Sequence, residues 1–414
     1  MINIDEIREV AAQVSLANTV VEKDYALGWL LMGIFQHPFT KNSWVFKGGT
    51  CLKKCYFETY RFSEDLDFSF CGKTPPTVDE LNHIFADISD LIYEASGMEF
   101  QKASIEFEMF RTPRGAYSIQ GGIKYRGPVR PNVGLAQMQR IKIDLTLDEP
   151  LVLPAVIKQV EHRYSDNPSS GFLISAYHYE EVFAEKIRAL AQRLRPRDLY
   201  DVIHLHRRMD LEPDRDVVYS TLEKKCALRG VAIPTIKSVE KHDNWHFLQS
   251  EWETQLKHQI PILPNFQSFL SDLPQLFKWL KGEKIEELNQ LLVSKANESE
   301  SAVKKEAVSS LFLPGKATSF LDCIRFSAAN RLIVTLGYNG TCQDIEPYSF
   351  ARSSDGHLLL QTVQINNRES QAYSWDKIQS VKITKKTFIP KFIIEITSAG
   401  HLPVHQFRSV RPTL

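Results

Sequence analysis

The sequence predicts an α+β protein with a mixed sheet and helices near the N-terminus, a helical middle region and a small β-barrel at the C-terminus. Three patterns support this prediction. Apolar residues recur at helical spacing in residues 5–37, 78–95 and 177–290. Strand-like stretches separated by turn residues lie between the early helices and the middle region. Beyond about residue 318 the chain consists of short alternating strands with Gly and Asn turns.

The composition is that of an ordinary globular protein. A chain of 414 residues is long enough for two or three domains, and 43% hydrophobic with 24% charged residues is a typical balance. The formal net charge is +0, so any nucleic-acid-binding surface has to be local. We expect no leader and no membrane-spanning segment, because the N-terminus lacks a basic and apolar pattern and no long apolar run occurs. The expected location is cytoplasmic.

The early elements lead to the most informative segment, residues 46–68. After the helices of residues 5–37, an apolar run ends at Gly48-Gly49-Thr50, and Asp65 and Asp67 then alternate on a predicted strand. Strand residues two apart point to the same face, so both carboxylates aim at one spot beside the glycine turn. Mg²⁺ commonly takes one or two carboxylates together with substrate phosphates. The glycines let backbone N–H groups approach a phosphate at a helix N-terminus. The segment therefore predicts a phosphate cradle next to a metal site.

The following elements add further polar residues. A helix is expected over residues 78–95, and strands over 104–111, 117–125 and 140–147. The third of these strands alternates so that Asp144 lies on its polar face. From Tyr177 an apolar stripe predicts a helix in which Lys186 and Arg193 share a flanking face, and Pro196 separates it from a second helix.

The spacing of the glycine turn and the Asp-x-Asp pair resembles the nucleotidyltransferase signature of the DNA polymerase beta-like superfamily. Within that superfamily, the strings FKGGTCLKK, RFSEDLDF and EEVFAEKIRALAQRLRPRDLYDVIHL are similar to the AbiEii/AbiGii toxin family over roughly residues 20–205. The resemblance implies a polymerase-beta-like nucleotidyltransferase core in residues 1–150 and a helical region in residues 151–293 that completes the active site. The string VEKDY, which ends at Tyr25, also resembles a family element; a solvated helix face and a substrate-side role both stay open.

The resemblance also implies roles for individual residues. The expected catalytic residues are Asp65, Asp67, Asp144 and Lys186, and the three aspartates are the expected ligands of two Mg²⁺ ions, with Mn²⁺ as an alternative. The expected nucleotide-binding residues are Lys47, Gly48, Gly49, Thr50 and Arg193. Two alternatives stay open: Lys186 as a solvated surface lysine, and the arginines near the helix end as salt-bridge partners of Asp198 and Asp201.

The implied function is that of a Mg²⁺-dependent nucleotidyltransferase toxin. Such an enzyme transfers a nucleoside monophosphate from an NTP to an intracellular acceptor, here expected to be RNA such as tRNA. It acts in a type IV toxin-antitoxin or phage-defence (abortive infection) system with a separately encoded antitoxin. The alternatives are a small-molecule nucleotidyltransferase of the antibiotic-modifying kind and a non-catalytic nucleotide-binding regulator. The sequence leaves open the NTP, the acceptor, the antitoxin and the oligomeric state.

The C-terminal part is expected to be a separate module. Residues 294–317 are polar and short of aromatics, which is typical of a linker. Strands are expected over residues 331–338, 357–366, 369–375, 380–384 and 391–397. Residues 318–414 resemble the WYL domain, a small SH3/Sm-like barrel, although this chain has His357-Leu358-Leu359 in place of the naming Trp-Tyr-Leu.

Overall fold

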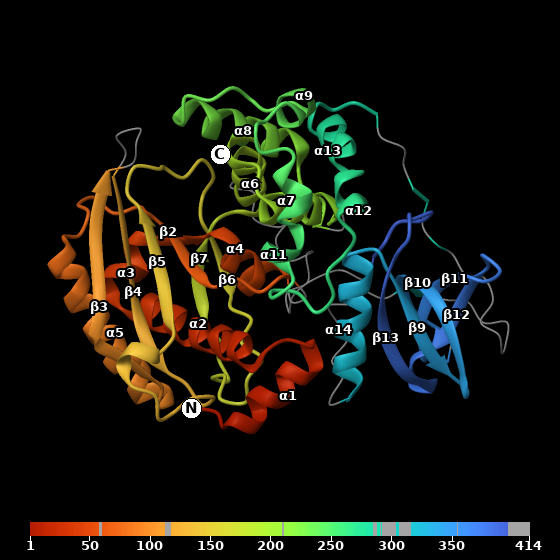
Figure 1. Cartoon of the computed structure of the whole chain (residues 1–414), viewed down its shortest axis with the longest axis horizontal. Coiled ribbons are helices and arrows are strands. Elements are labelled where there is room, and N and C mark those ends of the chain that lie inside the picture. Colours follow the sequence, from red (N-terminus) through yellow and green to blue (C-terminus); the bar gives the residue numbers. More distant parts are fainter. Residues whose placement is uncertain are drawn as a thin grey trace. The chain divides into compact units, whose positions relative to one another are not determined.

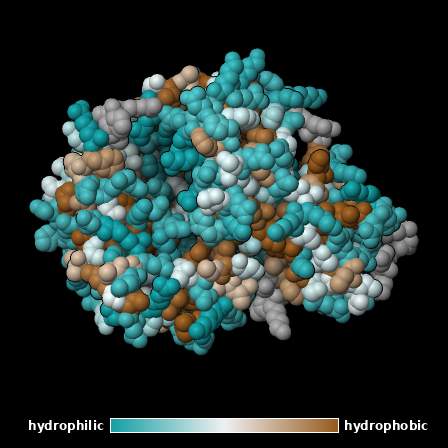
Figure 2. Space-filling view, viewed as in Figure 1, coloured by the Kyte–Doolittle hydropathy of each residue, from teal (hydrophilic) through white to brown (hydrophobic). Residues whose placement is uncertain are grey.

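The computed structural model describes residues 1–57, 60–111, 117–208, 211–284, 288–289, 291, 304–305, 316–353 and 355–395 (Figure 1). The chain forms two compact units. The first comprises Met1–Arg188, Ser220–Ile233 and His258–Pro261, and the second comprises Ala189–Tyr219, Pro234–Lys257 and the chain from Ile262 onward. Hydrophilic residues cover most of the visible surface, with apolar residues scattered among them (Figure 2). No helix in the described ranges is long and apolar enough to cross a membrane.

The first unit contains a mixed sheet, as the sequence predicts. Its seven described strands lie in the order β3-β4-β5-β2-β1-β7-β6. The pairs β1–β7 and β2–β5 are parallel and the other neighbouring pairs are antiparallel. The bounds are β1 Trp44–Lys47, β2 Asp65–Phe70, β3 Glu99–Arg111, β4 Tyr117–Arg126, β5 Arg140–Thr146, β6 Val156–Gln159 and β7 Leu173–Ala176.

Helices of the first unit pack against this sheet and contribute buried apolar residues to the core. The expected helices of residues 5–37 and 78–95 are present as α1 Ile4–Val14, α2 Asn18–Gln36 and α5 Val78–Ser96. Between Gly33 of α2 and the Ile88 and Ile92 side chains of α5 there is no space for a Cβ, so the two helices approach closely. A capping box formed by Thr77 and Glu80 starts α5. The remaining early helices are α3 Pro38–Ser43, α4 Gly48–Cys51 and the π-helix Leu52–Tyr56.

The sheet continues beyond residue 150, where the expected helical region would begin. Strands β6 and β7 lie in residues 156–176 and occupy one edge of the sheet. The expected boundary at residue 150 therefore does not coincide with the end of the sheet. Helix α6 Tyr179–Arg193 follows, with its residues up to Arg188 in the first unit, and α8 Arg215–Leu228 returns to the first unit at Ser220.

The second unit has a helical part and a β part. In the helical part, Tyr200 of α7 stacks on Phe269 with ring centroids 5.0 Å apart, and Trp252 packs on Phe269 at 5.3 Å. The helices are α7 Pro196–Arg207, α9 Ile236–Glu240, α10 Phe247–Ser250, α11 Trp252–Leu256, α12 Phe266–Leu270, α13 Leu273–Leu280 and α14 Lys316–Ala329.

The β part is an antiparallel sheet. Its strands lie in the order β12-β11-β10-β9-β13, and β8 Lys304–Lys305 pairs with β10. Four of the expected strands are present as β9 Leu332–Tyr338, β11 Leu358–Gln364, β12 Ser370–Ser374 and β13 Ile378–Thr387, whereas β10 Thr341–Arg352 was not expected.

Two expectations for the C-terminal part differ from the structure. Residues 391–395 make only an isolated bridge between Phe392 and Asn289, not a strand. Over the described strands the order is a linear path and does not establish a closed SH3/Sm-like barrel. Residues 396–414 and most of the expected linker lie outside the described residues.

Candidate active site

Strand register brings the predicted carboxylates together on one face of the sheet. In β1 and β2 Lys47 pairs with Asp67, and in β2 and β5 Asp67 pairs with Asp144. Paired residues on neighbouring strands point to the same face, and Asp65 lies on that face two residues before Asp67. Three carboxylates and one ammonium group therefore share a small area of the sheet.

Burial and repulsion from neighbouring carboxylates raise the pKa of Asp67 and of Asp144. Burial, with the negative charge of Asp144, raises the pKa of Asp67 to about 6, although the positive charges of Lys47 and Lys186 oppose the rise. Burial and the charge of Asp65 also raise the pKa of Asp144, against a hydrogen bond from Gln120. Carboxylates crowded in this way favour any cation that can be shared between them.

The glycine turn packs directly against this carboxylate group. Gly48 has φ +81°, and a Cβ at this position would collide with Oδ2 of Asp67. Only glycine fits both requirements. Helix α4 begins at Gly48, immediately after β1, and the Thr50 hydroxyl donates a hydrogen bond of 2.5 Å to the carbonyl oxygen of Asp65. This bond fixes the start of α4 to the start of β2.

Asp65, Asp67 and Asp144 offer the right donors for a hard divalent cation. Within the described part of the chain, no three His, Cys, Asp or Glu side chains are already arranged to hold a metal ion by themselves. Mg²⁺ needs fewer protein ligands, because it keeps waters and takes substrate phosphate oxygens. The close approach of Gly48 to Asp67 leaves a side-chain-free backbone next to the carboxylates. The residues present therefore fit a cation shared with a nucleotide phosphate.

The two basic residues predicted on α6 have different surroundings. Lys186 is buried, with 9% of its surface exposed, and its charge acts on Asp67. The alternative of a solvated surface lysine is therefore wrong. Arg193 lies in the second unit and makes a two-pronged ion pair with Asp198, with N–O distances of 2.7 and 2.6 Å. The salt-bridge alternative for Arg193 is thus observed, and its role in nucleotide binding stays a prediction.

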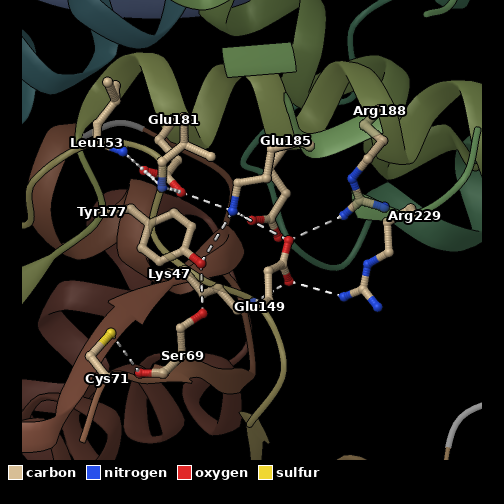
Figure 3. A network of polar contacts seen from close by, with 12 residues as sticks. Lys47, Ser69, Cys71, Glu149, Leu153, Tyr177, Glu181, Glu185, Arg188 and Arg229 are labelled. Atoms are coloured by element: carbon tan, nitrogen blue, oxygen red, sulfur yellow. Dashed lines mark hydrogen bonds and ion pairs between the residues drawn. The ribbon is translucent and has the colours of Figure 1, made fainter. Parts of the chain in front are cut away.

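A buried charge network that the sequence did not predict lies next to Lys47 (Figure 3). Glu149, which follows β5, accepts hydrogen bonds from Lys47 at 3.1 Å, from Lys225 at 3.3 Å and from Arg229 at 3.1 Å. Lys225, which is 0% exposed, also pairs with Glu181 at 2.8 Å. The surrounding cations hold the pKa of Glu149 well below its ordinary value, against the effect of burial. Glu181 lies in a string that resembles the family, but no spacing rule pointed to either glutamate.

Tyr177 connects this network to the sheet. Its hydroxyl lies 2.6 Å from the Ser69 hydroxyl, and Ser69 is on the same face of β2 as Asp67. The Lys225 ammonium lies 4.7 Å from the centre of the Tyr177 ring and the Lys47 ammonium lies 5.6 Å from it. Figure 3 shows the ring standing between the sheet and the charges of α6. The network therefore packs on the face of the sheet that carries the carboxylates.

The VEKDY element is largely buried, so a solvated helix face is the wrong description of it. Glu22 and Asp24 are 3% and 6% exposed. Asp24 accepts a 2.7 Å hydrogen bond from Lys54, which follows the glycine turn, and Lys23 pairs at 3.0 Å with Glu64, which precedes Asp65. The element thus anchors both segments that carry the candidate site.

Comparison with models of known protein families identifies the family of this chain. The profile described as "Nucleotidyl transferase AbiEii toxin, Type IV TA system" matches residues 29–276, which is more than half of the chain. The chain belongs to this family. Its members are nucleotidyltransferase toxins of type IV toxin-antitoxin systems, so an NTP substrate and a cognate antitoxin follow from membership.

Among solved structures, the chain is similar to MenT4, a nucleotidyltransferase toxin from Mycobacterium tuberculosis H37Rv. The two share 19% identity with a TM-score of 0.47, and the match covers 69% of this chain and 91% of MenT4. A search of curated proteins found no match.

Proposed function

We propose that this AbiEii family protein transfers a nucleoside monophosphate from an NTP to an RNA acceptor of the tRNA kind, in a type IV toxin-antitoxin or phage-defence setting in the cytoplasm. The observation that carries the proposal is the row formed by Lys47, Asp67 and Asp144 in register, with Asp65 beside it and the Gly48 turn against it. Nucleotidyl transfer requires in-line positioning and neutralisation of phosphate charge rather than covalent catalysis by the protein.

Each residue of the row has a proposed task. Asp65, Asp67 and Asp144 would hold Mg²⁺, with Mn²⁺ as a substitute. When bound, the metal supplies charge neutralisation on the phosphates and activation of the attacking hydroxyl. The backbone N–H groups of Gly49 and Thr50, at the start of α4, would bind the phosphates of the NTP.

Three basic residues complete the proposed nucleotide site. Lys186 and Lys47 would provide positive charge next to the carboxylates, and both already lower the pKa of Asp67. Arg193, which pairs with Asp198, would contact the nucleotide as well. We also propose that residues 318–414 are a WYL-like accessory module, because every candidate catalytic residue precedes residue 194.

The experiment is a labelling assay. The protein is incubated with each of the four α-³²P-labelled NTPs, Mg²⁺ or Mn²⁺, total RNA and a small-metabolite extract, and the products are separated by size. Label on tRNA-sized RNA supports the proposal. Label on a small metabolite indicates the antibiotic-modifying class instead, and NTP binding without transfer of label indicates a regulator.

Three aspartate variants test whether transfer takes place at the proposed site. Asp65→Ala or Asp67→Ala removes a proposed metal ligand, which should cost several kcal/mol of transition-state stabilisation. The rate of transfer should therefore fall on the order of a thousandfold. Asp90→Ala is the matched control, because Asp90 is an exposed aspartate whose ion-pair partner is Lys102. Transfer that persists at the wild-type rate in Asp67→Ala would show that the row is not the active site.

A further inference from the structure

Strand pairing places Lys47 beside Asp67, but the Lys47 ammonium group bonds to Glu149 instead. Lys47 is the direct neighbour of Asp67 in register. Paired side chains on one face have Cβ atoms about 4.5–5.5 Å apart, and opposite charges at such positions attract. Yet the Lys47 Nζ bonds to Glu149 at 3.1 Å, and within the described part of the chain no ion pair joins it to Asp67.

Glu149 is held in place independently of Lys47. The residue is 4% exposed, and Lys225 and Arg229 each donate a hydrogen bond to it. Lys225 is in turn fixed by Glu181, which accepts backbone hydrogen bonds from Val152 and Leu153 on the chain segment after Glu149. The Glu149 carboxylate is therefore a fixed anchor to which the flexible lysine is attached.

An ion pair between Lys47 and Asp67 would interfere with metal binding. An ammonium group on Asp67 would occupy a carboxylate oxygen that a hard cation needs. It would also add a positive charge at the place where the cation has to enter. A lysine held a short distance away still stabilises the ionised carboxylate but leaves its oxygens accessible.

We infer that Glu149 is a positioning residue that holds the Lys47 ammonium away from Asp67 and so keeps the Asp67 carboxylate accessible to the divalent cation. This inference rests on the proposed function, because it takes Asp65 and Asp67 as metal ligands. It predicts that loss of Glu149 weakens metal binding through Lys47 and not through general disorder.

The test measures Mn²⁺ binding by electron paramagnetic resonance, with and without an NTP analogue that cannot be cleaved between its α- and β-phosphates. Asp67→Asn first establishes the site: if wild type and Asp67→Asn bind Mn²⁺ equally, the proposed metal site itself is wrong. If Asp67→Asn loses binding, Glu149→Gln is expected to weaken it by roughly tenfold or more, the usual effect of losing an outer-shell partner.

Two further variants separate positioning from packing. The double variant Lys47→Met/Glu149→Gln should regain Mn²⁺ affinity to within about threefold of Lys47→Met, because the Lys47 ammonium group is no longer present to compete with the cation. Glu181→Gln is the matched control: it neutralises another buried carboxylate on Lys225 but keeps the Glu149 carboxylate, which still bonds Lys47 and Arg229, so its Mn²⁺ affinity should stay within about threefold of wild type.

The outcomes are decisive in either direction. Equal weakening in Glu149→Gln and Glu181→Gln, or no recovery in the double variant, would overturn the inference. Thermal melting of every variant establishes that it is folded. Glu149→Asp serves if Glu149→Gln does not fold, since the shorter side chain keeps the charge but withdraws it from Lys47; unchanged Mn²⁺ affinity in folded Glu149→Asp would also contradict the inference.

Discussion

Replacing Asp67 by Asn should make the metal-free protein more stable while removing its activity. The folded environment raises the pKa of Asp67 from an ordinary 3.8 to about 6. At neutral pH the folded protein therefore carries an ionised group in surroundings that favour the neutral form. Asn has nearly the same shape as the neutral acid and carries no charge, so the repulsion from Asp144 disappears.

The magnitude follows from the pKa difference. A difference of about 2 in pKa corresponds to about 3 kcal/mol. Because the side chain is only half-buried, solvent screening reduces this to about 1–2 kcal/mol. For a domain of about 150–250 residues, each kcal/mol moves the melting temperature by about 2–4 °C. We expect Asp67→Asn to melt about 2–8 °C above wild type at pH 7.5 without metal.

The sign of the pH dependence provides an internal check. Between pH 3.8 and about 6 the folded state holds a proton on Asp67 that the unfolded state has released, so wild-type stability falls as the pH rises. The advantage of Asp67→Asn is therefore largest above pH 6 and vanishes below about pH 3.8.

The assay is thermal melting from pH 4 to pH 8, with exposed Asp90→Asn as the control that should not change. Added Mg²⁺ and NTP should stabilise wild type and not Asp67→Asn, because ligands stabilise the state that binds them. A melting temperature for Asp67→Asn at or below that of wild type at pH 7.5 without metal would refute the reasoning.

Further predictions concern the residues around this carboxylate. Gly48→Ala should lower transfer at least tenfold, because φ +81° costs a non-glycine residue about 1–2 kcal/mol and the new Cβ displaces Asp67; Gly49→Ala should be milder, since flexible side-chain ends lie nearest. Equal rates in the two variants would contradict this. Lys186→Ala should slow transfer roughly a hundredfold, with poor rescue by Lys186→Arg, because a planar fork does not replace a point charge; an unchanged rate would remove Lys186 from the site. In a pH titration at limiting Mg²⁺, transfer should fall as the pH drops through about 6, where Asp67 becomes protonated; a flat profile from pH 5 to pH 8 would show that this protonation is not linked to transfer. Glu149→Gln should melt below wild type, the opposite of Asp67→Asn, because its pKa is held down by neighbouring cations.

Strand and helix positions could be predicted wherever the pattern is periodic. Helix α5 keeps its apolar residues at helical spacing, and β5 alternates, so both were expected within a few residues of their observed bounds. Strand β10 was missed because residues 345–351 are all buried and show no alternation. Pro347 also lies next to a register shift, which is the sheet position where proline is tolerated.

In the candidate site too, the features set by local geometry could be predicted and those set by strand pairing could not. The common face of Asp65 and Asp67 and the need for glycine at residue 48 are local properties, set by strand geometry and by the turn that precedes α4. Asp144 was placed on a polar face by its own alternation, but only the register of β2 and β5 put it opposite Asp67.

By itself, the sequence determined the chemistry available to this protein: a glycine turn, two carboxylates on one face and the strings that resemble its family. The tertiary structure alone decided which charges meet around Lys47. Lys47 bonds to Glu149, about a hundred residues away in the chain, and Lys225 closes the network from α8. No local periodicity encodes such partners, because a buried charge acquires its partner only when distant elements pack and exclude water. The accessibility of Asp67 is therefore a property of the folded sheet and its covering helices.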